Sequence, residues 1–247
     1  MLGWITGFAL LGSLGAIGAA ALFLLFPENV RRFIVPSLIS YATGTLLGAA
    51  FLGMIPAALG QAAARTVMTT VLAGMVLFFV LEKLVLWRHS HDEHCDARGS
   101  AGPLILFGDS LHNFVDGVVI AVAFMTSLPL GIATSMAVIA HEIPQEVGEF
   151  AILLDAGYSR TKALLLNALS ASMTLPGGIL AWFWLAGTQQ AVPYVLALSA
   201  ASFIYIATAD LIPSLNKPQT AAASAWQFVL LVTGIATIAL FHIGGGT

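Results

Sequence analysis

Long runs of apolar residues, separated by short polar segments, dominate the chain. A helix needs about 20 mostly apolar residues to cross a bilayer. By that measure the runs fall roughly at 1–26, 34–60, 66–87, 101–125, 130–155, 160–187, 191–215 and 225–245. Turn or charge signals lie between them, such as Pro27-Glu28-Asn29 and the polar segment 88–100. The pattern predicts an all-α membrane protein, in which eight transmembrane helices form a single domain over residues 1–247.

Composition agrees with this prediction and excludes several other classes. Of 247 residues, 59% are hydrophobic and only 9% are charged, whereas about a quarter are charged in soluble domains. A net charge of −3 with scattered basic residues excludes a nucleic-acid binder built on a basic face. The single cysteine, Cys95, excludes an internal disulfide framework. The first run has no basic leader and is longer than a signal-peptide core, so we expect it to remain as a helix.

The charges of the loops predict the orientation in the membrane. The odd-numbered loops hold Arg31, Arg32, Arg88, Arg98, Arg160, Lys162 and Lys217, whereas the even-numbered loops hold only Arg65. Positive residues prefer the cytoplasmic side. Both termini are therefore expected outside the cytoplasm, with the loop 88–100 inside. The short loops favour a bacterial inner (plasma) membrane over an organelle.

A short sequence recurs in the second and seventh runs. Met54-Ile-Pro in the second run matches Leu211-Ile-Pro in the seventh. The match suggests an inverted repeat of the kind that many transporters contain. So short an apolar match also arises by chance, so this alternative stays open.

The middle of the chain is rich in acids that have no basic partner nearby. Residues 99–159 contain no Lys or Arg, but they contain Asp109, Asp116, Glu142, Glu146, Glu149 and Asp155. An ionised carboxylate at the bilayer centre costs about 3 kcal/mol or more. These acids must therefore face water, bind protons or meet a mobile cation, and only Asp155 suits a tolerated helix end.

The fourth run carries a polar stripe formed by Asp109, His112, Asn113 and Asp116. Their spacing of i, i+3, i+4 and i+7 brings them to one helix face. His112 and Asp116 are one turn apart and can reach the same ion, and imidazole with carboxylate suits zinc or another first-row divalent metal. The alternative is a stripe of interhelical hydrogen bonds, although such stripes favour Ser, Thr and Asn over acids.

The fifth run carries a second polar face. Its members are His141, Glu142, Gln145, Glu146 and Glu149. Pro144 removes a helix hydrogen bond and frees a carbonyl near residue 140, which a membrane helix tolerates best beside a polar cavity. The pattern predicts a cavity-lining helix, and the alternative for Pro144 is a simple packing kink.

Two motifs together carry a family resemblance. HNFVDG at 112–117 followed by HEIPQEVGEF at 141–150 resembles the paired signature of the ZIP (Zrt- and Irt-like) family of divalent-metal transporters. The closest pattern is the subgroup whose fifth span reads HExPHExGD. The resemblance implies a ZIP-like bundle, a homodimer, and a binuclear metal site between the fourth and fifth spans. By motif match, the implied ligands are His112, Asn113, Asp116, His141, Glu142, Gln145 and, as a subgroup residue, Glu146.

The chain departs from the family pattern at three positions. Gln145 stands where the subgroup commonly has His, and Glu149 stands where it has Asp. Because an amide oxygen is a weaker ligand than an imidazole nitrogen, zinc preference is expected to differ. Leu175 precedes Pro176 where some relatives supply a Glu, which puts the second metal position in doubt.

Further candidates lie outside the two motifs. Met54 is a candidate thioether ligand or a packing residue. Asp109, Glu149 and Asp210 are candidates for additional ligands or for the ion pathway, and hydrogen bonding between helices is the alternative for Asp210. In the loop 88–100, the cluster of His89, His91, His94 and Cys95 predicts weak, exchangeable binding of released metal, against an ordinary solvated linker.

The leading hypothesis is a secondary transporter that moves a divalent cation into the cytoplasm, with zinc first and iron, manganese or cadmium as further substrates. The sequence has no nucleotide-binding motif, so we expect neither ATP hydrolysis nor an organic cofactor. The expected partners are metal ions and lipid, not nucleic acid. An intramembrane zinc metalloprotease is an alternative because His141-Glu142 begins like HExxH, although Gln145 replaces its second His. A channel or a proton-linked carrier of another cation is the third hypothesis.

Overall fold

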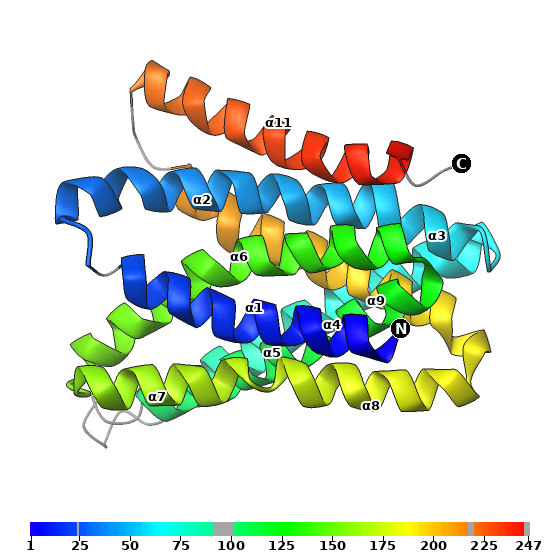
Figure 1. Cartoon of the computed structure of the whole chain (residues 1–247), viewed down its shortest axis with the longest axis horizontal. Coiled ribbons are helices and arrows are strands. Elements are labelled where there is room, and N and C mark those ends of the chain that lie inside the picture. Colours follow the sequence, from blue (N-terminus) through cyan, green and yellow to red (C-terminus); the bar gives the residue numbers. More distant parts are fainter. Residues whose placement is uncertain (24, 91–100, 217–219, 245–247) are drawn as a thin grey trace.

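The computed structural model of the chain describes residues 1–23, 25–90, 101–216 and 220–244, which form a bundle of long helices (Figure 1). The α-helices are α1 (Leu2–Phe23), α2 (Glu28–Gly48), α3 (Ile55–Leu59), α4 (Ala64–Ser90), α5 (Ala101–Thr126), α6 (Leu128–Asp155), α7 (Arg160–Ala171), α8 (Thr174–Gly187), α9 (Val192–Tyr205), α10 (Ile212–Leu215) and α11 (Ala221–Gly244). Two π-helical segments, η1 (Ala49–Met54) and η3 (Ile206–Leu211), and a 3₁₀ turn, η2 (Gln189–Ala191), join them. These residues contain no β-strand, which confirms the predicted all-α class.

Seven helical stretches in the described part of the chain are long and apolar enough to cross a membrane. They are Leu2–Ala19, Phe33–Leu59, Ala64–Leu84, Leu106–Thr126, Arg160–Gly187, Gln189–Leu215 and Ala221–Phe241. The sequence predicts eight, and the difference is α6. Its 28 residues suffice for a crossing, but the polar side chains of its second half keep it out of the seven stretches that are apolar enough. Since α6 packs against α1, α2 and α5, protein surrounds it on several sides.

The helices form two groups that differ in their neighbours. In the first group, α5 packs against α6 and α8, and α1 packs against α6 and α8. In the second group, α2 packs against α11, and α4 packs against α9. Contacts of α6 with α2 and of α5 with α9 join the two groups. Both motif-bearing helices, α5 and α6, therefore belong to the first group.

The backbones of α5 and α8 touch where the sixth expected span is interrupted. A Cβ added at Gly117 on α5 would overlap the carbonyl oxygen of Thr174, and one added at Gly177 on α8 would overlap the carbonyl of Phe114. Small residues at such crossings let membrane helices approach closely. This contact holds the break between α7 and α8 beside the polar stripe of α5.

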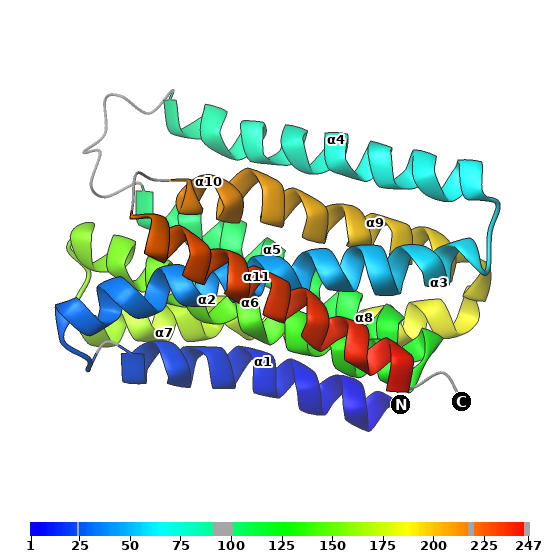
Figure 2. The ribbon, with the colours of Figure 1, turned by 90° about the horizontal axis from the view of Figure 1, so that it is seen from above.

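The sequence repeat of the second and seventh expected spans coincides with a local structural repeat. Each span contains a six-residue π-helical segment that ends at the first residue of the repeat, Met54 in η1 and Leu211 in η3. A short α-helix with Pro in its first turn follows each segment, with Pro56 in α3 and Pro213 in α10. The two spans run in opposite directions through the bundle (Figure 2), and α9 packs against η1 and α3. Opposite direction is the relation that an inverted repeat requires.

Candidate metal centre

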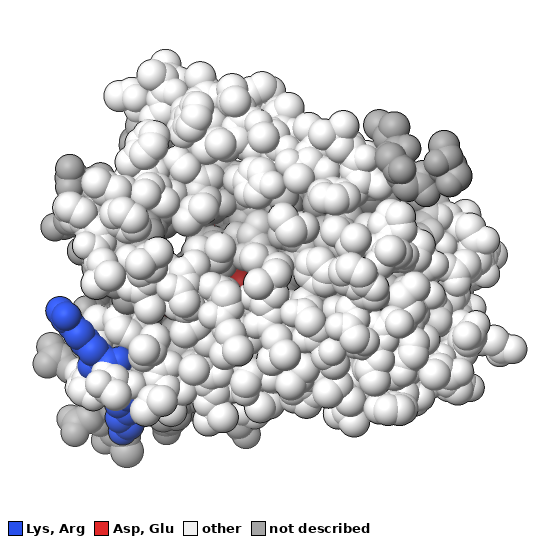
Figure 3. All heavy atoms as spheres, in the orientation of Figure 1, with Lys and Arg blue, Asp and Glu red and all other residues white. Residues whose placement is uncertain are grey.

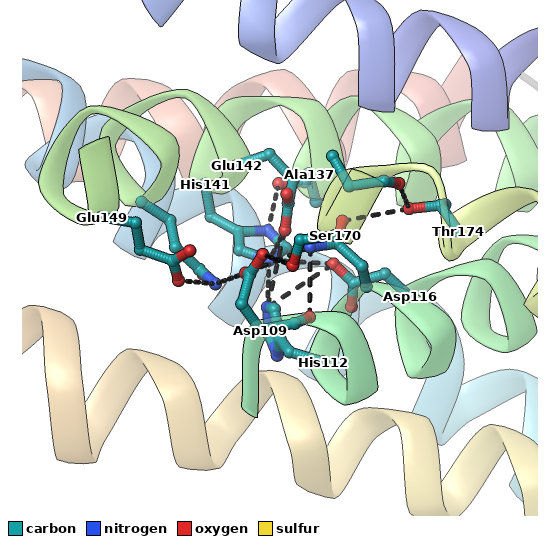
Figure 4. A network of polar contacts seen from close by, with 12 residues as sticks. Asp109, His112, Asp116, Ala137, His141, Glu142, Glu149, Ser170 and Thr174 are labelled. Carbon is teal, nitrogen blue, oxygen red and sulfur yellow. Dashed lines mark hydrogen bonds and ion pairs between the residues drawn. The ribbon is translucent and has the colours of Figure 1, made fainter. Parts of the chain in front are cut away.

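Four side chains from α5 and α6 converge inside the bundle. His112 and Asp116 come from α5, and His141 and Glu142 come from α6 (Figure 4). One ligand atom from each residue lies within 4.8 Å of the ligand atoms of the other three. We call these four residues the cation layer. On α5 the two residues are one turn apart, because i, i+4 neighbours share a helix face, whereas on α6 they are consecutive residues.

The spacing of the four ligand atoms suits a small tetrahedral ion. His112 Nε2 lies 3.2 Å from His141 Nε2, and His141 Nε2 lies 3.1 Å from Asp116 Oδ2 and 3.4 Å from Glu142 Oε1. His112 Nε2 lies 3.7 Å from Asp116 Oδ2 and 3.5 Å from Glu142 Oε1. Ligands about 2.05 Å from a tetrahedral zinc ion would lie about 3.3 Å from one another. The observed separations bracket that value.

The carboxylates of the cation layer lack hydrogen-bond donors. The side chains of Asp116 and Glu142 are 0% and 2% exposed, and none of their four oxygens has a hydrogen-bond partner in the described structure. A buried carboxylate is stable only when a donor or a cation compensates for its lost hydration. His112, at 19% exposed, is the only member of the layer with appreciable exposure. The layer is therefore a largely buried site with the chemistry to bind a cation, and it is accessible on the side of His112.

A backbone contact fixes how His141 presents its ring. Its Nδ1 lies 3.0 Å from the carbonyl oxygen of Ala137, one turn earlier on α6. A carbonyl can only accept, so Nδ1 carries the hydrogen and the neutral ring keeps its lone pair on Nε2. This second interaction is typical of imidazoles that bind metals. The lone pair of His141 consequently faces the other three ligand atoms.

A second set of polar residues lies beside the cation layer and is hydrogen-bonded. Asp109 Oδ1 accepts from Asn113 Nδ2 at 3.1 Å and from Gln145 Nε2 at 2.9 Å, and Asp109 Oδ2 accepts from Ser170 Oγ. Thr174 Oγ1 lies 3.1 Å from Asn113 Oδ1. We call Asp109, Asn113, Gln145, Ser170 and Thr174 the amide layer. In contrast to the cation layer, protein donors compensate its carboxylate.

Comparisons with known proteins show which family the chain belongs to. Residues 87–242, more than half of the chain, match the family described as "ZIP Zinc transporter". The zinc transporter ZIP13 of Pongo abelii is 32% identical over 264 aligned positions, which cover 95% of this chain and 78% of the relative. The chain belongs to the ZIP family. Its members are transporters rather than enzymes, so the metalloprotease hypothesis is not supported.

Other ZIP proteins match shorter parts of the chain at higher identity. The metal cation symporter ZIP14 of Mus musculus is 42% identical over 119 residues, which cover 48% of this chain and 24% of the relative. The human zinc transporter ZIP4 is 40% identical over 114 residues, which cover 46% of this chain and 18% of the relative. The matched segments are thus a small part of these relatives.

The structure separates the residues that the ZIP resemblance implies as ligands. Asn113 uses its amide nitrogen on Asp109, at 3.2 Å from the carbonyl and 3.1 Å from Oδ1, and its amide oxygen is close to Thr174. Gln145 Nε2 points to Asp109 and also lies 3.5 Å from Glu149 Oε1. Glu146 is 1% exposed, and neither carboxylate oxygen has a hydrogen-bond partner among the described residues. Glu146 is not among the four converging residues.

The remaining candidates of this ZIP chain are not among the four converging residues. Met54 is fully buried in the apolar core, within η1. Asp210 is exposed, in η3. The predicted metal-collecting cluster of His89, His91, His94 and Cys95 falls outside the described residues, apart from the backbone of His89 at the end of α4.

Several polar residues near the site were missed by sequence reasoning. Asn167, Ser170 and Thr174 are buried in the sixth expected span, and they contact Glu146, Asp109 and Asn113. Their spacing of i, i+3 and i+7 is the same one-face pattern that singled out α5, so a signal was available. Tyr205, whose hydroxyl donates to Glu82 across α9 and α4, had no comparable signal because each is isolated in an apolar run.

Proposed function

We propose that this ZIP-family chain carries zinc and related divalent cations across the membrane, with the cation layer as its transport site. The observation that carries the proposal is the spacing of four buried ligand atoms, at 3.1–3.7 Å for the five pairs that involve an imidazole. Two imidazoles and two carboxylates provide four ligands and two negative charges, which match a divalent ion in number and in charge.

The donor set supports zinc as first substrate without excluding similar metals. Imidazole nitrogen suits zinc, iron and other first-row metals, and carboxylate oxygen suits manganese. Thioether and thiolate ligands are absent from the cation layer, so a specific preference for a soft ion is not expected. We therefore expect iron, manganese and cadmium to compete with zinc at the same site.

The helix groups support transport by displacement of a complete site. All four ligands lie on α5 and α6, which pack within one helix group, whereas α2, α4, α9 and α11 form the other. If the first group shifts against the second, the cation travels without exchange of protein ligands. Ion gradients would drive such a secondary transporter.

Surface charge and the positions of acids support movement into the cytoplasm. Lys and Arg gather at one end of the face seen in Figure 3, where α7 begins, and this is the end that the loop charges predict as cytoplasmic. Asp109, Gln145, Glu146 and Glu149 lie between the cation layer and that end, since α5 begins and α6 ends there (Figure 1). We propose Glu146 as the next acid that a released cation meets, with Asp210 and Glu82 further along the exit.

Chain direction supports α6 as an eighth crossing. The beginning of α1 and the end of α11 lie at the same end of the bundle (Figure 1), which requires an even number of crossings. Seven described stretches are apolar enough, and α6 adds the eighth. Both termini would then lie outside the cytoplasm, and the short loops favour the inner membrane of a bacterium.

The decisive experiment is uptake of radioactive zinc into proteoliposomes that contain the purified full chain. Wild type is compared with His141→Ala, with unlabelled iron, manganese and cadmium as competitors. We expect saturable uptake that the variant loses while it remains inserted and monodisperse. Uptake by His141→Ala close to the wild-type rate would refute the proposed site. Flux that does not saturate with zinc would favour a channel over a carrier.

A further inference from the structure

Asp109 and Gln145 form a cross-helix pair beside the pair of histidines. Asp109 precedes His112 by three residues on α5, and Gln145 follows His141 by four residues on α6. The bond from Gln145 Nε2 to Asp109 Oδ1, at 2.9 Å, therefore joins the two helices one turn from the contact between the two imidazoles. This hydrogen bond therefore constrains the distance between α5 and α6 beside the cation layer.

The amide of Gln145 is committed to this contact. Its two acidic neighbours, Asp109 Oδ1 at 2.9 Å and Glu149 Oε1 at 3.5 Å, are acceptors, so the amide must turn its nitrogen toward them. Asp109 is itself held, because Asn113 and Ser170 donate to the same carboxylate. At 4% exposed, Asp109 sits in a setting where such charge-assisted bonds are strong.

The cation layer is complete without an amide ligand. Five of the six separations between its ligand atoms, at 3.1–3.7 Å, are close to tetrahedral spacing, and zinc in proteins is almost always held by four donors. Asn113, the other amide that the family motif assigns to the metal, is likewise engaged at both ends, by Asp109 and Thr174. The two amides thus behave alike, as partners of Asp109.

We infer that Asp109 and Gln145 form a brace that sets the spacing of α5 and α6, and that Gln145 is a positioning residue rather than a cation ligand in this chain. The inference rests on the proposed function in taking the cation layer as the transport site. Partners that orient metal ligands typically change affinity by about 10–100-fold when they are removed. Loss of the brace is therefore expected to weaken cation binding, although neither Asp109 nor Gln145 contacts the ion.

Exchanging donor and acceptor distinguishes a brace from a ligand. Gln145→Glu removes the N–H donor and adds a third carboxylate beside Asp109 and Glu149, so the brace is lost. Combining it with Asp109→Asn restores a donor and an acceptor in reversed order. A ligand at position 145 would instead bind zinc more tightly as Glu, with or without the change at position 109.

The measurement uses the purified full chain in detergent micelles and two readouts. Zinc affinity is obtained by competition with a chromogenic chelator, and cobalt(II) absorption in the visible region reports the number and geometry of ligands. The matched control is Gln61→Glu, because Gln61 is exposed and its side chain bonds only to the carbonyl of Ala57 among the described residues. It introduces the same chemical change far from the site.

We expect Gln145→Glu to weaken zinc binding about tenfold or more. Asp109→Asn/Gln145→Glu should recover binding to within about threefold of wild type, with the cobalt spectrum of the wild type. Gln61→Glu should match wild type. Tighter binding by Gln145→Glu, or a double variant as weak as the worse single variant, would overturn the brace.

Alanine variants keep the inference falsifiable if Gln145→Glu does not fold. A brace predicts that Gln145→Ala weakens zinc binding in the wild-type background but adds little to Asp109→Ala, because Asp109→Ala already removes the bond to Gln145 together with those from Asn113 and Ser170. Factors that multiply in the double variant would contradict the brace. His141→Ala tests the transport site separately from the brace. Retained zinc binding in this variant would refute the transport site, whatever the outcome at positions 109 and 145.

Discussion

The cation layer and the amide layer lie side by side and both contain buried acids, but the cation layer comes from α5 and α6 alone, whereas the amide layer adds Ser170 of α7 and Thr174 of α8. They differ in their partners. Asp109 in the amide layer accepts hydrogen bonds from three side chains, whereas Asp116 and Glu142 in the cation layer accept none in the described structure. Protein donors compensate the amide layer at all times, so it can act as fixed scaffold. The carboxylates of the cation layer face the two imidazoles and receive no hydrogen bond in the described structure, so their charge is available to a cation, as a transport site requires.

The largest predicted effect comes from removing charge in the cation layer. Glu142→Gln keeps the shape of the side chain but removes half of the negative charge that neutralises a divalent ion. We expect zinc uptake into proteoliposomes to fall about 100-fold or more. Removing a residue that only orients a metal ligand already costs up to about 100-fold, and Glu142 is proposed to bind the ion directly. Insertion and monodispersity serve as controls. A fall of less than about threefold would contradict the proposal that Glu142 of the cation layer binds the transported ion.

Ligand-induced stabilisation should separate the layers next. A ligand present at 100 times its dissociation constant stabilises the folded state by about 2.7 kcal/mol. We expect zinc to raise the apparent unfolding temperature of wild type and to have no such effect on Asp116→Asn. Without metal, Asp116→Asn should be at least as stable as wild type, since it removes an uncompensated buried charge. A lower unfolding temperature of metal-free Asp116→Asn would contradict this.

A smaller change is expected from loosening the amide layer. Thr174→Val removes the hydroxyl next to Asn113 Oδ1 and leaves a buried acceptor unpaired, which costs about 1 kcal/mol. Stability should fall even without metal, the opposite of the result for Asp116→Asn, while zinc uptake continues. Ser135→Ala is the control, since within the described structure the hydroxyl of this buried serine bonds only to the carbonyl of Gly131 on its own helix. Equal losses of stability in both variants would contradict the role of the amide layer as a fixed scaffold.

The smallest effect concerns the polar loop, which lies outside both layers. Deleting residues 89–95 removes His89, His91, His94 and Cys95. Because exposed donors in a short loop bind metal weakly and exchange it rapidly, we expect a lower uptake rate at low zinc, with transport retained. Complete loss of uptake by an inserted protein would show that the loop is part of the transport path.

Sequence periodicity was most informative where polar residues recur on one helix face. His112 with Asp116, and His141 with Glu142, were predicted as metal ligands, and the structure brings these four together. The same reasoning did not separate Gln145 from His141, since both occupy the same face of α6. Their roles diverge through donors on other helices, including Ser170, that periodicity within one helix cannot locate.

Helix count and helix shape show a similar division. The apolar runs of the sequence located the long helices, α6 among them, but α6 is not one of the seven stretches that are apolar enough to cross a membrane, because the polar side chains of its second half lower its hydropathy. The Ile-Pro repeats can be recognised in the amino-acid sequence, whereas the π-helical segments that precede them are recognised only in the structure. A proline limits helix geometry locally, but whether the preceding turn widens depends on packing against a neighbouring helix.

The sequence by itself determined that this is an all-helical membrane protein of the ZIP type, because apolar run length and motif spacing are properties of the chain alone. It also determined which side chains could reach one ion from one helix, since the helical period fixes their directions. Only the tertiary structure decided which buried polar atoms receive hydrogen bonds and which do not. That difference depends on residues brought together from α5, α6, α7 and α8, and it distinguishes the hydrogen-bonded amide layer from the proposed cation site.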